Sequence, residues 1–538
     1  MAAAAAAPGF IATAQTAGAE PAASTLPKSN ESNYLETVNG WYTHNGKPVW
    51  GFAQHNQWWG GYRGTPTGWW SDCDLRPSLI RNDPGKIGLN HTEDFDQLTD
   101  SMLRDGYPAF EHTPALWFDR RRDTHETIKH SSGNVVGPVF EMPWARSDQG
   151  QAWDGLPLYD LTQFNDWYFK RLKDFADLCD RKGCIFYFNF YNQHNLLETQ
   201  AHYCDFPWRP TNCIQATELP DVNPVANVFY DVSHPLRRQL HQLYIRHCLD
   251  VLKDNRNVVL LTGMEFTGPL SFMQFWFDTI LDWEKGAGRK MHIGVGATKD
   301  VLDAMLQDAR YGPRIGTIDT RYFCLDPNGA LQALAGGQQI PGRVVQKGDD
   351  MAYLQVYKLV REYRDKYPDK AIIRTLDGKQ DQAVAFLMAG GSMIVRELGY
   401  AREYPATYET PLGCAEILPI YDFLRNNLGE DLLHMKPLDV LNKPDTLFCL
   451  GERGKNYLIY MPFGNQWFKI DLTDAPGTYD ATWVGMRLGK VFKAIGRFDL
   501  SEESARIRGY GGTIEGGKMV DLSGLDWRPW MLWLRKRA

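Results

Sequence analysis

The chain has 538 residues, of which 43% are hydrophobic and 13% aromatic, enough apolar side chains to bury a large core. Its 58 Lys and Arg against 65 Asp and Glu give a net charge of -7, which argues against a nucleic-acid partner. Past the N-terminus, no run of about 18 apolar residues predicts a membrane span. The 18 Trp and 25 Tyr would suit surfaces that stack on sugar rings, although large cores also use them.

After Met1, the N-terminal stretch up to Ala23 is rich in Ala, and its only large apolar side chains are Phe10 and Ile11. It resembles a truncated secretory signal peptide without its basic start, and a flexible tail is an equal alternative. We therefore leave residues 1–33 out of the predicted fold and expect a periplasmic or secreted protein. The nine cysteines include no CxxC pair, so neither a zinc ribbon nor a thioredoxin-type centre is predicted.

Strand-like and helix-like segments alternate eight times after residue 46. We expect strands at residues 47–53, 107–112, 184–190, 257–265, 292–296, 315–319, 371–375 and 392–395. We expect helices at residues 92–104, 161–181, 236–252, 271–283, 300–308, 351–366, 380–389 and 415–426. Apolar strands that alternate with helices are typical of a parallel sheet covered on both faces. Eight such units predict an α/β fold, the (β/α)8 TIM barrel, whereas a doubly wound sheet would need a Gly-rich turn after its first strand.

Past residue 433 the chain changes to short β-rich runs, separated by turns that contain Gly, Pro and Asn. This pattern is typical of a small all-β sandwich. The sequence therefore predicts a catalytic barrel over residues 34–436 and a C-terminal β-sandwich over residues 437–538. We expect the β-sandwich to buttress the barrel, with polymer binding as the alternative.

The polar residues that close the predicted strands form the candidate site, because active sites of such barrels lie at the carboxyl ends of the strands. In chain order they are Gln54, His55, Asn56, Glu111, His112, Asn189, Asn192, His194, Asn195, Glu265, Asp319, Arg321, Arg374, Asp377, Arg396 and Glu397. One polar strand end is ordinary, since strands stop at the surface. Polar residues at the ends of seven strands, all on one face of the barrel, predict a functional site.

Glu265 closes a largely apolar strand, and a carboxyl group in that setting tends to have a raised pKa, which suits a general acid. A structural carboxylate that accepts loop amides is the alternative. Asp319 has a similar place, and Arg321 two residues later points to the same face. That pairing would hold Asp319 ionised as a base or nucleophile, or it would be a plain salt bridge. Further candidates for the second carboxylate are Glu111, Asp377 and Glu397.

The segment from Asn189 to His202 is dense in amide, imidazole and carboxylate groups. Such groups suit hydrogen bonds to sugar hydroxyls, with the nearby Trp208 as a stacking platform. His194, Glu198 and His202 also recur every four residues, as metal ligands on one helix face would. A role in organising the loop is an equal alternative, and the tight HExxH of zinc hydrolases is absent. We therefore predict neither a metal nor any other cofactor.

The barrel region contains the motifs Trp117-Phe-Asp-Arg-Arg-Arg-Asp-Thr-His125, Tyr159-Asp-Leu-Thr, Gln193-His-Asn, Pro207-Trp-Arg-Pro, Glu265-Phe-Thr-Gly-Pro and Asp319-Thr-Arg-Tyr. They resemble a family of bacterial proteins known mainly as a domain of unknown function. The C-terminal region contains Gly464-Asn-Gln-Trp-Phe-Lys-Ile-Asp-Leu and Pro476-Gly-Thr-Tyr-Asp-Ala-Thr-Trp, which resemble a collagen-binding-type β-sandwich. A barrel followed by such a sandwich resembles bacterial glycoside hydrolases of the retaining (β/α)8 superfamily and the apiosidase-like group beside it.

The resemblance implies roles for individual residues. The acid/base of that superfamily is a Glu at the end of strand four, which corresponds to Glu265, with Met264 where Asn is usual. Its nucleophile closes strand seven, where this chain has Asp377 and no Glu. Asp319 and Glu397 are the alternatives for that role.

The sequence thus predicts a glycoside hydrolase that cleaves a fragment of a plant, algal or microbial polysaccharide, with Glu265 as general acid and Asp319 or Asp377 as nucleophile or base. The predicted substrate-binding residues are His55, Glu111, His112, Trp117, Asn189, Asn192, His194, Asn195, His202, Trp208, Arg321 and Glu397. We expect no nucleic-acid or membrane partner. The alternatives are a sugar-binding protein without activity and a metal-dependent hydrolase or lyase that uses His194, Glu198 and His202.

Overall fold

The computed structural model describes most of the chain between residues 34 and 538. The described ranges are 34–55, 62–64, 73–75, 95–104, 106–114, 142–153, 155–197, 203–204, 206–264, 266–338, 351–376, 380–397, 418–464, 466–487, 490–494, 512–525 and 527–538. Residues Asn33–Ala538 form one compact unit.

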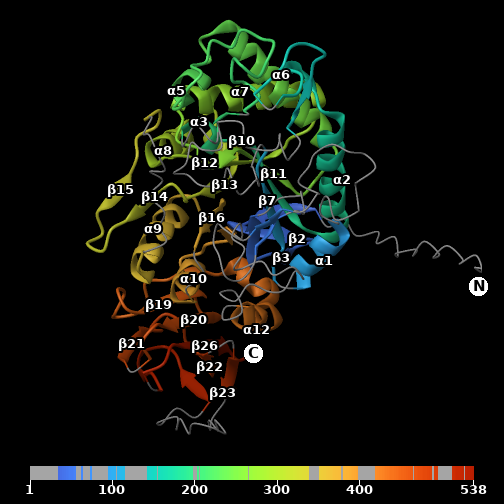
Figure 1. The fold of residues 1–538 in the computed structure, drawn as a ribbon. Helices are drawn as coiled ribbons and strands as arrows, with labels where there is room; N and C mark the ends of the chain where they lie inside the picture. The colour runs from blue at the N-terminus through green and yellow to red at the C-terminus, as the bar shows by residue number, and fades with distance from the viewer. Residues whose placement is uncertain are drawn as a thin grey trace, which may run out of the picture. The chain divides into compact units, whose positions relative to one another are not determined.

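Eight parallel strands close into a barrel, as the sequence predicts (Figure 1). In order around the barrel they are β4 (Phe52–His55), β7 (Ala109–His112), β10 (Ile185–Asn192), β11 (Val258–Met264), β12 (His292–Gly296), β13 (Ile315–Asp319), β16 (Ala371–Thr375) and β17 (Met393–Glu397). Their order in space follows their order in the chain, which is the arrangement of a TIM barrel. The carboxyl ends of all eight strands therefore lie on one face.

Helices follow the strands and surround them (Figure 1). They are α1 (Phe95–Arg104), α2 (Asp166–Lys182), α6 (Pro235–Leu252), α7 (Leu270–Ala287), α8 (Lys299–Gln307), α9 (Tyr353–Lys366), α10 (Gln380–Met388) and α12 (Leu418–Leu428), with the short α3 (His194–Leu197) and α5 (Ala226–Phe229). Local sequence sets the helix ends: Asn165 caps α2 through the amides of Trp167 and Tyr168, and Gly183 ends it at a φ of 74°. Among the described residues, none of the helices is both long and apolar enough to span a membrane.

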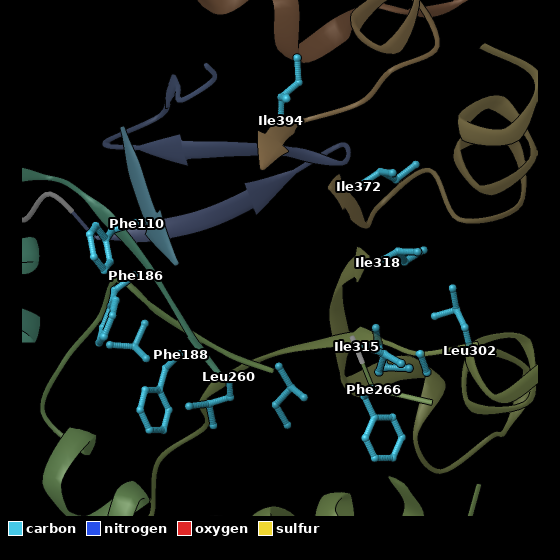
Figure 2. Close-up of a cluster of buried hydrophobic side chains, with 14 of the residues drawn as sticks. Phe110, Phe186, Phe188, Leu260, Phe266, Leu302, Ile315, Ile318, Ile372 and Ile394 are labelled. Atoms are coloured by element: carbon cyan, nitrogen blue, oxygen red, sulfur yellow. The ribbon is translucent and has the colours of Figure 1, made fainter. Parts of the chain in front are cut away.

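Side chains alternate between the inside and the outside of the barrel. Outward-facing residues pack beneath the helices, and Figure 2 shows part of this layer, including Phe110, Phe186 and Phe188 from β7 and β10. Inward-facing residues such as Ile185, Val259 and Ile373 form a separate core inside the barrel. This alternation fixes which strand residues can reach a site inside the barrel.

The amino ends of the strands are closed by a three-stranded sheet that the sequence analysis did not predict. It comprises β1 (Leu35–Val38), β2 (Trp41–His44) and β3 (Lys47–Pro48). Tyr42 and Leu35 join the core inside the barrel, and the Tyr42 hydroxyl lies 2.7 Å from the Thr317 hydroxyl. The prediction of a single strand over residues 47–53 is therefore wrong. Lys47–Pro48 pairs with β2, and the barrel strand begins only at Phe52.

Smaller elements lie in the loops between the barrel strands and helices. β5 (Tyr62–Gly64) pairs with β6 (Cys73–Leu75), β8 (Trp144–Arg146) with β9 (Tyr159–Phe164), and β14 (Phe323–Leu325) with β15 (Leu331–Ala333). The helix expected from residue 161 begins later, at Asp166, because β9 extends through Phe164 before Asn165 caps the helix.

The C-terminal region is made of antiparallel strands, as predicted. One sheet contains β18 (Lys436–Pro437), β19 (Phe448–Glu452), β20 (Asn456–Met461), β22 (Thr478–Arg487), β23 (Lys490–Ala494), β24 (Thr513–Glu515) and β26 (Trp530–Lys536), and the other contains β21 (Trp467–Asp471) and β25 (Met519–Ser523). Phe468, Trp483 and Leu522 belong to one core that both sheets share. Tyr357 of α9 stacks on Phe448 of β19 at 4.0 Å, so this region packs directly on a barrel helix.

Candidate functional site

Four predicted site residues meet inside the barrel near the carboxyl ends of its strands. Glu111 belongs to β7, Asn189 to β10, and Asp319 is the last residue of β13. Arg321 follows two residues after Asp319. All four side chains are buried, and they lie beyond the layer in which Tyr42 contacts Thr317.

Arg321 binds two carboxylates, one 210 residues away from it in sequence and the other only two residues away. Its Nη1 and Nη2 donate to Glu111 Oε2 and Oε1 at 2.8 and 2.7 Å, a bidentate pair. Its Nε donates to Asp319 Oδ2 at 2.7 Å, and its backbone amide donates to Asp319 Oδ1 at 3.1 Å. The guanidinium therefore spans the barrel between β7 and β13.

Asn189 extends this network toward the third strand. Its Nδ2 donates to Glu111 Oε1 at 3.0 Å and lies 3.3 Å from both the His112 carbonyl and the Thr113 hydroxyl. These acceptors fix the orientation of the amide, since an amide oxygen could not donate to a carboxylate. Asn189 Oδ1 is buried and has no hydrogen-bond partner among the described residues. A buried acceptor without a partner is costly, so this oxygen is an unsatisfied group within the network.

A glycine on the neighbouring strand makes room for the Asp319 carboxylate. A Cβ at Gly296 of β12 would lie 2.8 Å from Asp319 Oδ2 and 3.0 Å from the ring of Tyr322. Any larger residue there would displace the carboxylate from Arg321. The local sequence of β12 is thus part of the network although it contributes no polar side chain.

The charges of the network do not balance, because one guanidinium faces two carboxylates. Burial raises the pKa of Asp319; Arg321 opposes this shift, and the charge of Glu111 adds to it, so the pKa ends above its ordinary value. For Arg321, burial alone would lower the pKa, but Asp319 and Glu111 outweigh burial and raise it. Arg321 therefore stays charged, and the carboxylates share an excess negative charge that favours retention of a proton.

Glu265 lies outside the described residues, and the structure describes the segment that follows it from Phe266. Phe266 is fully buried against the rings of Tyr230 and Phe272. Gln193, in the loop after β10, accepts a hydrogen bond from the Thr267 amide at 2.9 Å and donates to the Thr267 hydroxyl. Sequence reasoning missed Gln193 as a functional residue, although it begins the quoted Gln193-His-Asn motif.

The structure also describes His112, Trp208, Asn192 and Asn195. His112 Nε2 lies 3.0 Å from the Tyr168 hydroxyl of α2, on the helix side of the barrel. Trp208 is fully buried, stacked on His241 at 4.7 Å and in contact with Phe229, so its indole faces are covered by protein. Asn192, the last residue of β10, and Asn195 of α3 are also buried.

The remaining predicted residues lie outside what the structure describes in full. Trp117, Glu198, His202 and Asp377 fall outside the described residues, as Glu265 does. For His55 and Glu397 the backbone register is defined: Glu397 pairs with His55, and His55 pairs with Glu111. His194 begins α3. Within the described ranges, no group of three or more His, Cys, Asp or Glu residues is placed to hold a metal ion.

Comparison with known proteins supports the fold. Residues 7–404 match a family described as a domain of unknown function (DUF6298). A solved structure titled glycoside hydrolase is 10% identical, with a TM-score of 0.50, over 94% of this chain and 97% of that one. A glycoside hydrolase family 5 protein from Bacteroides vulgatus ATCC 8482 is 11% identical, with a TM-score of 0.51, over 94% of each chain. No curated protein sequence matches this chain. The chain therefore has the fold of glycoside hydrolases.

Proposed function

Because the chain belongs to the family described as a domain of unknown function (DUF6298) and has the fold of glycoside hydrolases, we propose that it hydrolyses a glycosidic bond in a polysaccharide-derived oligosaccharide. Two carboxyl groups at the carboxyl ends of the barrel strands would perform the reaction. A hydrolytic activity does not follow from the fold alone, since barrels of this kind catalyse many different reactions.

The observation that carries the proposal is the buried network of Glu111, Asn189, Asp319 and Arg321. Burying charged groups is expensive and is tolerated where function needs it, and perturbed carboxyl groups in a barrel mouth indicate such a place. The network lies where TIM barrels place their active sites.

We assign the general acid to Glu265, which follows the last residue of β11. In this role it donates a proton to the glycosidic oxygen as the bond breaks. The second carboxylate attacks the anomeric carbon or activates a water molecule. Asp319 is fully buried and receives hydrogen bonds from Arg321 at both oxygens, which favours Asp377 for a step that needs a free carboxylate oxygen.

Product release from a panel of oligosaccharides and aryl glycosides tests this function, with wild type compared with Glu265→Gln. We expect the wild type to cleave at least one substrate and Glu265→Gln to lose about a hundredfold or more in kcat, because the amide cannot donate the proton. Asp377→Asn should lose more activity than Asp319→Asn. Loss of wild-type activity on treatment with a chelator would instead favour the metal-dependent alternative at His194, Glu198 and His202. Sugar binding without turnover would favour the binding protein.

A further inference from the structure

The segment Phe266–Pro269, directly after Glu265, is held on both sides by neighbouring loops. Gln193 Oε1 accepts from the Thr267 amide at 2.9 Å, and Gln193 Nε2 donates to the Thr267 hydroxyl. Both side chains are buried, at 3% and 5% exposure. One amide side chain thus holds the backbone and the side chain of the same residue, two positions after Glu265.

Gln193 is itself fixed, so it can act as an anchor. Its carbonyl accepts from the amides of Leu196 and Leu197 at 2.9 and 3.1 Å, which starts the helix α3. The backbone of Gln193 is therefore held by α3 at the point where its side chain contacts the loop after the fourth strand. A side chain supported in this way can hold its partner in place.

The other side of Thr267 is held by the chain that follows β15. The Thr267 carbonyl accepts from the Gly337 amide at 2.8 Å. The adjacent Gly336 amide donates to Asp300 of α8 at 2.9 Å, and a Cβ at Gly336 would lie 2.2 Å from the Val301 side chain. The glycine is needed for this close approach, and both polar groups of the Thr267 backbone are satisfied by different loops.

We propose that Gln193 is a positioning residue that supports the general-acid step by fixing the backbone at Thr267, two residues after Glu265. This inference rests on the proposed function, in which Glu265 is the general acid. Proton transfer requires the donor within hydrogen-bond reach of the glycosidic oxygen, and misplacement by about 1 Å can cost a hundredfold in rate. In this proposal, Gln193 acts through Thr267 and not on the reacting atoms.

The test compares Gln193→Met, which keeps the length of the side chain and removes both hydrogen bonds, with wild type and Glu265→Gln. Thr267→Val removes the hydroxyl at nearly constant shape, and Thr267→Ser is its matched control because it keeps the hydroxyl. The substrates are aryl glycosides of one sugar with leaving groups of increasing basicity. A weakly basic leaving group departs without a proton, so only the basic ones depend on the acid.

We expect Gln193→Met to lower kcat/KM, which reports cleavage of the glycosidic bond alone, about tenfold for basic leaving groups and less than about twofold for weakly basic ones. Thr267→Val should show the same pattern more weakly, and Thr267→Ser should resemble the wild type. An equal loss on every substrate would show a merely structural role and overturn the proposal. If Glu265→Gln shows the leaving-group pattern and Gln193→Met does not, the proposal fails while the proposed function stands.

Amide hydrogen exchange at Thr267 tests the clamp even if no substrate is cleaved. Gln193→Met removes the acceptor of this amide, so we expect its exchange to be at least about tenfold faster than in the wild type. Unchanged exchange would overturn the proposal, whatever the activity assays show. Absence of cleavage on the whole panel would count against the proposed function alone.

Discussion

At the scale of single residues, the network depends on Arg321, which neutralises part of the charge on two buried carboxylates. Its bonds to Glu111 and Asp319 leave both carboxylates hydrogen-bonded inside the barrel. Buried ion pairs add little net stability, but removing one partner leaves uncompensated charge. Arg321 is therefore the residue whose loss should most disturb the barrel interior.

We predict that Arg321→Met lowers the free energy of unfolding by about 3–5 kcal/mol at neutral pH. The pKa of Asp319 is already raised by burial and by Glu111, and loss of Arg321 would raise it further. A raised carboxyl pKa favours folding at acid pH, and that contribution is lost as pH rises through the folded-state pKa. Urea unfolding at several pH values should therefore show the deficit growing from acid to neutral pH.

Arg537→Met is the matched control for this experiment. Arg537 pairs with Asp480 at 2.7 Å, but both side chains are about half exposed. Exposed pairs contribute about 1 kcal/mol or less. A deficit in Arg321→Met as small as that of Arg537→Met, or one that shrinks toward neutral pH, would contradict the role assigned to the buried network.

Glu111, Asn189, Asp319 and Arg321 could be predicted as candidate site residues, because each lies at or near the end of an apolar strand. The contacts between these side chains could not be predicted. The pairing of Arg321 with Glu111 joins residues 210 positions apart, and local sequence carries no signal for it. The clamp by Gln193 on Thr267 was missed for the same reason, since it joins two loops 74 residues apart.

At the scale of elements, β10 and α6 meet around a buried histidine. His241 Nε2 lies 2.9 Å from the Phe229 carbonyl, and its Nδ1 lies 2.9 Å from the Tyr191 hydroxyl. A carbonyl can only accept, so Nε2 carries the proton and Nδ1 accepts from Tyr191. This arrangement fits a neutral imidazole, and burial lowers the pKa of His241 to about 3.

We predict that His241 makes the protein less stable as pH falls from about 6.5 toward 3. The unfolded chain binds a proton in this window and the folded chain does not, so the stability present above pH 6.5 is lost on acidification. At pH 5 the loss should be about 2 kcal/mol relative to pH 8. His241→Gln should show a shallower decline in urea unfolding across this range, and an unchanged slope would contradict the neutral, buried histidine.

Most barrel elements could be predicted because strands and helices differ in the period of their apolar residues. The error at the first strand has a physical cause: residues 47–53 read as one run, but Gly51, at a φ of 144°, lies between β3 and the barrel strand. The sheet of β1, β2 and β3 was missed because residues 34–46 carry turn signals and short apolar stretches, and its partner, the barrel interior, is distant in sequence.

At the scale of the whole molecule, the C-terminal sheets share a hydrophobic cluster with the barrel. Phe448, Tyr460 and Trp533 belong to the same buried cluster as the outer layer of the barrel. Arg361 of α9 also donates to both carboxylate oxygens of Asp439 at 3.0 and 2.9 Å. We infer that the C-terminal region stabilises the barrel by packing on α9.

We predict that residues 33–538 unfold in one calorimetric transition. Phe448→Ala should remove the ring that stacks on Tyr357 and cost about 3–5 kcal/mol, because it leaves a cavity in the shared cluster. The single transition should then move to lower temperature as a whole. Two separate transitions in the wild type, with only the smaller one displaced by Phe448→Ala, would show that the C-terminal region folds independently of the barrel.

The most direct test of the central claim is hydrolysis of a glycosidic bond by the purified chain, compared with Glu265→Gln and Glu36→Gln. Glu36 lies on β1, in the sheet at the amino ends of the strands, so the same chemical change is made at the opposite end of the barrel. We predict that the wild type and Glu36→Gln release product at equal rates, while Glu265→Gln falls by about a hundredfold or more. Equal rates for all three proteins would contradict the assignment of Glu265, and no product from any of them on a broad panel would contradict the proposed hydrolase.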